Sequence, residues 1–254
     1  MSPSMLPRLV LMPGMDGTAL LFGPFEEALD SLSWPHQLVS YPTDRPLGYR
    51  ELKRLVQQQL PADEEFVLVA ESFSGPLALQ LASERPRGLV GVVLAASFVR
   101  PPLPLPAALC AAAGCLAPWL APLLFWRPPP RWAQRLLLIG LDASDKQVGW
   151  LSAAIATCKP SVFGKRVAEV MSVDVRQELK DCPAPLLYLQ ASRDNLVHAA
   201  SARTIESIRS DVPLVKLAAP HLLLQRAPAA AAEAIQHWLE ALRPASAGSA
   251  DTRG

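Results

Sequence analysis

Ser72, Asp194 and His221 are the residues whose types and order in the chain fit nucleophilic catalysis. A serine hydroxyl is a poor nucleophile at neutral pH. It needs a base to accept its proton and a carboxylate to hold that base in the right tautomer. Each of the three residues follows a short apolar run that predicts a strand. We therefore interpret Ser72, His221 and Asp194 as candidate nucleophile, base and acid for acyl transfer.

Ser72 lies between the apolar run at residues 66–69 and a segment with helical spacing from residue 76. A strand, a sharp turn with a central serine and a helix form the context of a nucleophile elbow. That turn needs small residues two positions before and after the serine, and here they are Ala70 and Ser74, followed by Gly75. Both replace the glycines of the usual G-x-S-x-G pattern. The alternative interpretation is a small-residue turn without chemistry.

The partners of Ser72 are chosen by their positions relative to the predicted strands. Of the four histidines, only His221 follows a late strand in a loop, and Asp194 lies just beyond the strand at 186–190. One helix and one strand fit between them, as neighbouring strand ends of a parallel sheet require. The weaker acid candidates precede a strand, as Asp211 does, or fall in an inserted segment, as do Asp142 and Asp145.

Six short apolar runs predict strands, at residues 9–12, 37–41, 66–69, 89–95, 186–190 and 214–217. Helical spacing predicts helices at residues 22–29, 49–60, 76–84, 164–181, 199–208 and 228–242. This alternation predicts an α/β fold, with a mostly parallel sheet of about six strands and helices on both faces. The predicted core, residues 1–98 and 163–243, brackets a Pro-rich helical cap at 99–162, and the small, polar tail at 244–254 is predicted to be disordered.

The cap segment has no charged residue from 101 to 126. Length and polarity alone would suggest a transmembrane helix. Prolines at 104, 106, 118 and 122 divide the run into short pieces, however, and a single span would place Ser72 and His221 on opposite sides of a membrane. We interpret the segment as a cap. Its apolar side chains suggest binding of an apolar acyl chain, with ordinary cap core as the alternative: Trp119, Leu123, Phe125 and Trp126.

Arg131 and Arg135 lie four residues apart, on one face of a predicted helix that starts after three prolines. Such a basic ridge could bind a phosphate or an acidic acyl-carrier protein. The alternative is a solvated helix face. A peripheral membrane contact through the apolar part of the cap is a further expectation.

The composition of the chain argues against several classes of protein. The chain has 254 residues, 50% of them hydrophobic, and a net charge of +1, which gives no reason to expect nucleic-acid binding. The N-terminus lacks the features of a signal peptide, so we expect a cytoplasmic protein. The four cysteines show no metal-ligand spacing and are predicted to be buried, and we expect no metal or cofactor.

These motifs together resemble the α/β-hydrolase superfamily, over roughly residues 8–100 and 163–242. The elbow, the Asp194 turn and the His221 loop carry the resemblance, and residues 13–17 match the family's oxyanion loop with Pro13 in place of a histidine. The resemblance implies that the backbone N–H groups of Met15 and Phe73 form the oxyanion hole.

A serine at the elbow points to an acyl-enzyme, and hence to a serine esterase acting on carboxylic esters or thioesters. The size, cap and arginines of the chain are similar to those of carboxylesterases that demethylate pimeloyl-carrier-protein methyl ester in biotin synthesis. An acyltransferase with the same triad and a non-catalytic binding protein are the remaining alternatives.

Overall fold

Six parallel strands form one sheet, in the order β2-β1-β3-β4-β5-β6. The computed structural model describes residues 6–103, 106–124 and 126–242. The strands are β1 (Arg8–Met12), β2 (His36–Leu38), β3 (Phe66–Glu71), β4 (Leu89–Ala95), β5 (Leu186–Ala191) and β6 (Leu214–Leu217). The central strand β3 is buried along its whole length, as expected of a parallel strand covered on both faces. The predicted fold class is confirmed.

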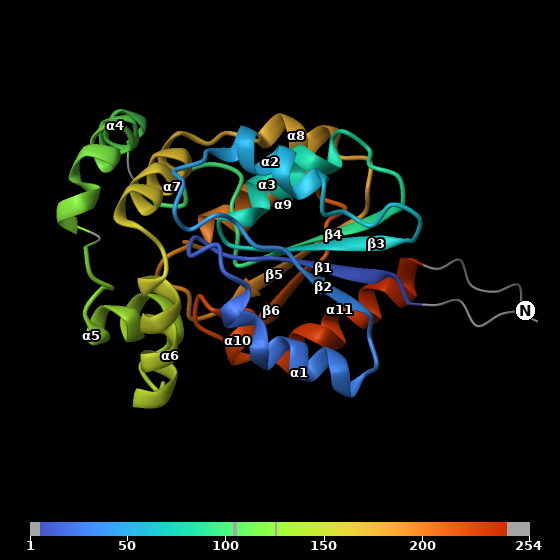
Figure 1. Cartoon of the computed structure of the whole chain (residues 1–254). Helices are drawn as coiled ribbons and strands as arrows, with labels where there is room; N and C mark the ends of the chain where they lie inside the picture. Colours follow the sequence, from blue (N-terminus) through green and yellow to red (C-terminus); the bar gives the residue numbers. More distant parts are fainter. Residues whose placement is uncertain (1–5, 104–105, 125, 243–254) are drawn as a thin grey trace, which may run out of the picture.

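Two helical layers cover the sheet, one on each face (Figure 1). The first layer contains α2 (Tyr49–Gln57), α3 (Ser74–Ala82), α8 (Arg176–Asp181) and α9 (Ala200–Ile208). The second contains α1 (Gly23–Ser31), which follows the 3₁₀ turn η1 (Ala19–Phe22), together with α10 (Leu223–Arg226) and α11 (Pro228–Leu242). Alternate side chains of each strand enter opposite cores. Val10 and Leu68 pack under the first layer, whereas Leu9 and Val67 pack under the second.

The cap follows β4 and lies at one end of the molecule (Figure 1). It contains α4 (Ala107–Leu124), α5 (Arg131–Gln134), the π-helical turn η2 (Arg135–Ile139), α6 (Asp145–Ala156) and α7 (Pro160–Ser172). The boundary predicted after residue 162 falls inside α7. Of the four cysteines, Cys115 of α4 is exposed, contrary to expectation.

The prolines of the cap do not divide it as predicted, because Pro118 and Pro122 lie inside α4. Each proline removes one intrahelical hydrogen bond. Packing against α7 keeps the helix continuous, since Gly164 of α7 lies directly against Ala117, Pro118 and Ala121. Within residues 6–103, 106–124 and 126–242, no helix combines the length and the apolar character needed to cross a membrane.

Two elements differ in length from the prediction because contacts with distant segments end or interrupt them. The second strand was expected at residues 37–41 but ends at Leu38. Tyr41 leaves the sheet, and its backbone N–H donates to Gly17 O, which lies in the loop after β1. The helix predicted at 164–181 is two helices, α7 and α8. Between them, the N–H of Val175 donates to Val99 O, beyond the end of β4.

Candidate active site

The turn between β3 and α3 holds Ser72 in the left-handed region of backbone conformation, at φ 49°. This conformation is strained for a residue with a side chain and is typical of functional turns. Neighbouring groups hold it in place. Ser72 N–H donates to Ala95 O, and Ser97 Oγ donates to Ser72 O at 2.7 Å. Gly75 has no room for a side chain, because a Cβ atom there would lie 1.8 Å from Ser97 Oγ.

Ser74, which replaces a glycine of the usual elbow pattern, has a structural role of its own. Its hydroxyl donates to Pro13 O in the loop after β1, and it is also hydrogen-bonded to the Tyr41 hydroxyl at 2.5 Å. The elbow is thereby tied to the segment predicted to carry the oxyanion hole. A glycine at this position could not make either bond.

Ser72, His221 and Asp194 are brought together from three separate loops. His221 Nε2 lies 2.9 Å from Ser72 Oγ, and His221 Nδ1 lies 2.8 Å from Asp194 Oδ2. Because a carboxylate only accepts, the tautomer that fits has Nδ1–H donating to Asp194 and Nε2 accepting from the serine hydroxyl. All three side chains are buried. This is the arrangement needed to deprotonate a serine during attack.

The other oxygen of Asp194 is also bound. Asp194 Oδ1 accepts the backbone N–H groups of Leu196 and Val197, both at 2.8 Å, so the carboxylate is held in one orientation. The weaker acid candidates have other partners. Asp211 forms a two-point pair with Arg209, and Asp142 pairs with Arg226.

The cap is hydrogen-bonded to both the acid loop and the histidine loop. Asn195 Nδ2 donates to Leu136 O of η2 at 2.9 Å, and the N–H of Leu222 donates to Leu138 O of the same turn. π-helical turns often occur at functional sites, where they leave carbonyl groups available for other partners. Here η2 positions the cap over the carboxyl ends of β5 and β6.

The predicted oxyanion donors belong to the loop after β1, which carries Met15, and to the elbow itself, which carries Phe73. Among residues 6–103, 106–124 and 126–242, the N–H groups of Met15 and Phe73 donate no hydrogen bond to the backbone. The loop carrying Met15 turns through Gly17, at φ +72°, whose N–H donates to Gly14 O at 3.1 Å. Two unpaired N–H donors beside a serine nucleophile are what an oxyanion hole requires.

Arg166 of α7 is a buried residue that the sequence analysis missed. Its Nη1 donates to Met15 O at 2.7 Å and its Nη2 to Pro42 O at 2.9 Å, and its guanidinium lies 5.9 Å from the ring centre of Phe73. Burial lowers the pKa of this guanidinium. The helical spacing of the sequence could have indicated its burial. Arg166 lies four residues from both Val162 and Val170, on the same buried face of the helix. Arg166 therefore links the cap to both residues of the predicted oxyanion hole.

Glu71, immediately before Ser72, is a second buried charged residue that the sequence analysis missed. Its Oε2 accepts from Gln225 Nε2 at 3.0 Å, while Oε1 has no partner in the part of the chain that the structure describes. Burial raises the pKa of Glu71 to about 7, opposed by the Gln225 hydrogen bond and by His221. A carboxyl close to the imidazole therefore changes charge near neutral pH.

The apolar cap residues expected to bind substrate lie on the outside of the cap. Trp119, Leu123 and Trp126 are 84%, 73% and 65% exposed, so they do not line an enclosed tunnel. Phe125 lies outside the described residues. A different apolar cluster is buried where the cap meets the site, and it includes Leu21, Ile139 and Leu222.

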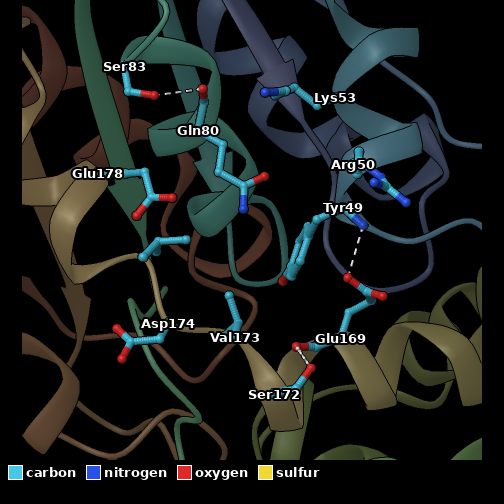
Figure 2. A pocket seen from close by; sticks show the side chains of 11 residues that line it. Tyr49, Arg50, Lys53, Gln80, Ser83, Glu169, Ser172, Val173, Asp174 and Glu178 are labelled. Carbon is cyan, nitrogen blue, oxygen red and sulfur yellow. Dashed lines mark hydrogen bonds between the residues drawn. The ribbon is translucent and has the colours of Figure 1, made fainter.

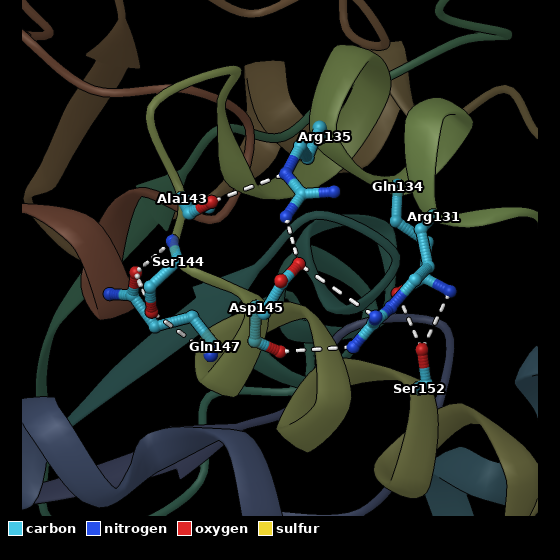
Figure 3. A network of polar contacts seen from close by, with 8 residues as sticks. All are labelled: Arg131, Gln134, Arg135, Ala143, Ser144, Asp145, Gln147 and Ser152. Atoms are coloured by element: carbon cyan, nitrogen blue, oxygen red, sulfur yellow. Dashed lines mark hydrogen bonds and ion pairs between the residues drawn. The ribbon is translucent and has the colours of Figure 1, made fainter.

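Arg131 and Arg135 converge on a single carboxylate (Figure 3). Arg135 Nη2 lies 2.6 Å from Asp145 Oδ1, and Arg131 Nη1 lies 3.7 Å from the same oxygen. The two arginines of the predicted basic ridge thus pair with Asp145 and join α5 and η2 to the start of α6.

A polar pocket of about 470 Å³ lies behind the elbow, between α2, α3 and the α7–α8 connection (Figure 2). Tyr49 separates it from the elbow, because its hydroxyl donates to Phe73 O at 3.0 Å and its ring stacks on that of Phe73. The opposite side of Tyr49 is held by Glu169, which accepts its backbone N–H. In the described ranges, no group of His, Cys, Asp or Glu side chains is arranged to hold a metal ion.

Comparison with known proteins agrees with the fold. Residues 9–234 match the model of the α/β hydrolase family. A search of curated proteins finds no match.

Solved structures share the fold at low sequence identity. A bromoperoxidase from Bacillus anthracis has a TM-score of 0.75 at 16% identity, over 93% of this chain and 92% of that one. An esterase from Exiguobacterium antarcticum has a TM-score of 0.73 at 12% identity, over 93% and 92%. A lipase-esterase related protein from Clostridium acetobutylicum has a TM-score of 0.71 at 14% identity, over 92% and 95%. The family match spans most of the sequence, and the chain therefore belongs to the α/β hydrolase family.

Proposed function

We propose that this protein is a serine hydrolase that cleaves carboxylic esters or thioesters through an acyl-enzyme. The observation that carries the proposal is the hydrogen-bonded chain from Ser72 Oγ through His221 to Asp194. Three residues far apart in the sequence meet at hydrogen-bonding distances, in the arrangement that acyl transfer by serine needs.

In the first half-reaction, Ser72 Oγ attacks the acyl carbonyl carbon while His221 Nε2 takes the hydroxyl proton. The carbonyl oxygen becomes negatively charged and accepts hydrogen bonds from the N–H groups of Met15 and Phe73. Each such donor lowers the barrier by about 3–4 kcal/mol. Asp194 stabilises the positive charge on His221. When the C–O or C–S bond breaks, the imidazolium gives its proton to the leaving alcohol or thiol.

In the second half-reaction, water replaces the leaving group. His221 Nε2 takes a proton from the water as it attacks the acyl carbon, and Ser72 Oγ regains a proton when the acid is released. The protein's own groups thus act twice, as base and then as acid.

An apolar acyl group fits the surroundings of the candidate triad. Leu222 directly follows His221, Leu21 lies just after the oxyanion loop, and Ile139 reaches them from η2 of the cap. These side chains form one buried cluster. An acyl chain placed against it would lose contact with water, which favours binding in proportion to the area buried.

The test is labelling and activity of the Ser72→Ala variant. The wild-type protein should hydrolyse p-nitrophenyl esters and react with a fluorophosphonate probe at Ser72, and Ser72→Ala should lose both properties while keeping its melting temperature. Ser207→Ala is the matched control, since Ser207 is an exposed serine whose hydroxyl bonds only to Thr204 O. Labelling at Ser74, or ester hydrolysis that survives in Ser72→Ala, would count against the proposal. Product analysis with added alcohol separates hydrolysis from acyl transfer to that alcohol.

A further inference from the structure

Helix α4 contacts the rest of the protein mainly through small residues on one side. Gly164 of α7 lies so close to it that a Cβ atom there would be 2.4 Å from Ala121 Cβ and 2.9 Å from Ala117 O. Gly114 of α4 also faces α7, where a Cβ atom would lie 3.4 Å from Met171 Cβ and 3.5 Å from Ala168 O, at ordinary contact distance. In Figure 1, α4 lies at the outer edge of the cap, beyond α7. Its opposite side therefore has no partner among the residues that the structure describes.

That outward side consists of large apolar residues. Leu109 and Leu116, two helical turns apart, are 55% and 54% exposed. The rest of this face is Trp119, Leu120, Leu123 and Leu124, all exposed. A contiguous apolar surface of this kind indicates a binding site rather than ordinary solvent-exposed surface.

The charged residues that flank α4 in the sequence are all arginines. From residue 99 to residue 141 the sequence contains four arginines and no lysine, aspartate or glutamate. Arg131 and Arg135 share Asp145, and Arg100 helps to lower the pKa of the Asp174 carboxyl. Arg127 is exposed just beyond the end of α4. The guanidinium of Arg127 lies 4.2 Å from the ring centre of the exposed Trp126.

We propose that the outward face of α4 binds to the surface of an anionic phospholipid bilayer. The leucines would enter the acyl-chain region, the exposed tryptophans would lie at the level of the headgroups, and Arg127 would face the lipid phosphates. A protein partner fits less well. Protein interfaces carry about one hydrogen bond per 100–200 Å², whereas this face offers only the indole N–H of Trp119.

Bilayer binding extends the proposed function, and its use to the protein rests on that function being correct. The cap covers the loops that carry Asp194 and His221, so docking through α4 would bring the candidate site to a phase in which apolar esters concentrate. The binding itself does not depend on catalysis and can be measured without it.

The test is co-sedimentation with vesicles of phosphatidylcholine alone and of phosphatidylcholine mixed with phosphatidylglycerol. The wild-type protein should bind the mixed vesicles more tightly than the neutral ones, and salt should weaken the difference. Leu109→Gln/Leu116→Gln should lower binding on the order of 100-fold, since burying each leucine is worth about a factor of ten or more. Hydrolysis of a short, water-soluble ester should be unchanged in this variant.

The matched control is Leu32→Gln/Leu242→Gln, which removes two leucines that are 44% and 41% exposed outside the cap. It should bind vesicles as the wild type does. Absence of wild-type binding, or equal binding by the Leu109/Leu116 variant, would overturn the proposal. So would a dimer in vesicle-free solution that this variant dissociates, because a second copy would then cover the face. If vesicles bind as expected but no ester is hydrolysed, only the proposed function fails.

Discussion

Replacing Asp194 by asparagine should remove nearly all activity, because of how its two oxygens are bound. Oδ1 accepts two backbone N–H groups, from Leu196 and Val197, and Oδ2 accepts the proton of His221 Nδ1. In the variant, the amide oxygen should take the Oδ1 position, since turning the amide NH₂ toward two N–H donors would lose two hydrogen bonds. That loss costs about 2–3 kcal/mol.

The amide NH₂ group of the variant then faces His221 Nδ1. An N–H donor at this place forces Nδ1 to accept, so the imidazole proton moves to Nε2. A protonated Nε2 cannot take the proton of Ser72 Oγ, from which it is 2.9 Å away. In a serine triad the wrong tautomer lowers kcat about ten-thousand-fold, which corresponds to about 5 kcal/mol of transition-state stabilisation.

The assay is kcat for a p-nitrophenyl ester, measured with thermal melting to show that the variant is folded. Asp211→Asn is the control, because Asp211 pairs with Arg209 on an exposed turn away from His221, and it should keep kcat within about two-fold of the wild-type value. A folded Asp194→Asn variant that loses less than about ten-fold, or an equal loss in Asp211→Asn, would refute the tautomer argument.

Two further predictions concern the buried charged residues beside the site. Because burial raises the pKa of Glu71 from 4.5 to about 7, its contribution to stability is complete below pH 4.5 and is lost as the pH rises through 7. Between pH 5 and pH 8, the unfolding free energy of Glu71→Gln should therefore fall by roughly 2–3 kcal/mol less than that of the wild type, as measured by urea titration. Parallel curves for the two proteins would contradict this. Arg166→Ala leaves the carbonyls of Met15 and Pro42 without a donor and should lower kcat on the order of 10- to 100-fold. Free guanidinium should partly restore the activity, an equal concentration of sodium chloride should not, and a loss that guanidinium leaves untouched would point to general destabilisation.

Local sequence patterns were sufficient to predict the order of the strands and helices along the chain. The buried strands before Ser72 and Asp194 are short apolar runs ended by turns, and such runs predict parallel strands wherever they occur in the chain. Because the strands are parallel, residues that follow them collect at one edge of the sheet. This geometric consequence is why Ser72, Asp194 and His221 could be grouped before any distance was known.

Contacts between distant segments decided where some elements end and which partners some side chains have. Tyr41 leaves its strand because Gly17 and Ser74 bind it, and the helix predicted at 164–181 is interrupted where Val175 meets Val99. Arg135 was predicted to face a ligand, but Asp145 binds it. None of these partners is close enough in sequence to leave a periodic signal.

The sequence by itself determined the fold and the residues of the candidate triad, because hydrophobic periodicity and turn chemistry are local properties of the chain. Only the tertiary structure decided which charged residues are buried and which apolar residues are exposed. Arg166 is enclosed under the loop after β1, and Glu71 is buried next to Ser72, whereas Trp119 faces outward. The physical reason is that burial depends on the packing of whole helices. The close approach of α4 to α7 at Gly164 leaves the large side chains of α4 only the outer surface.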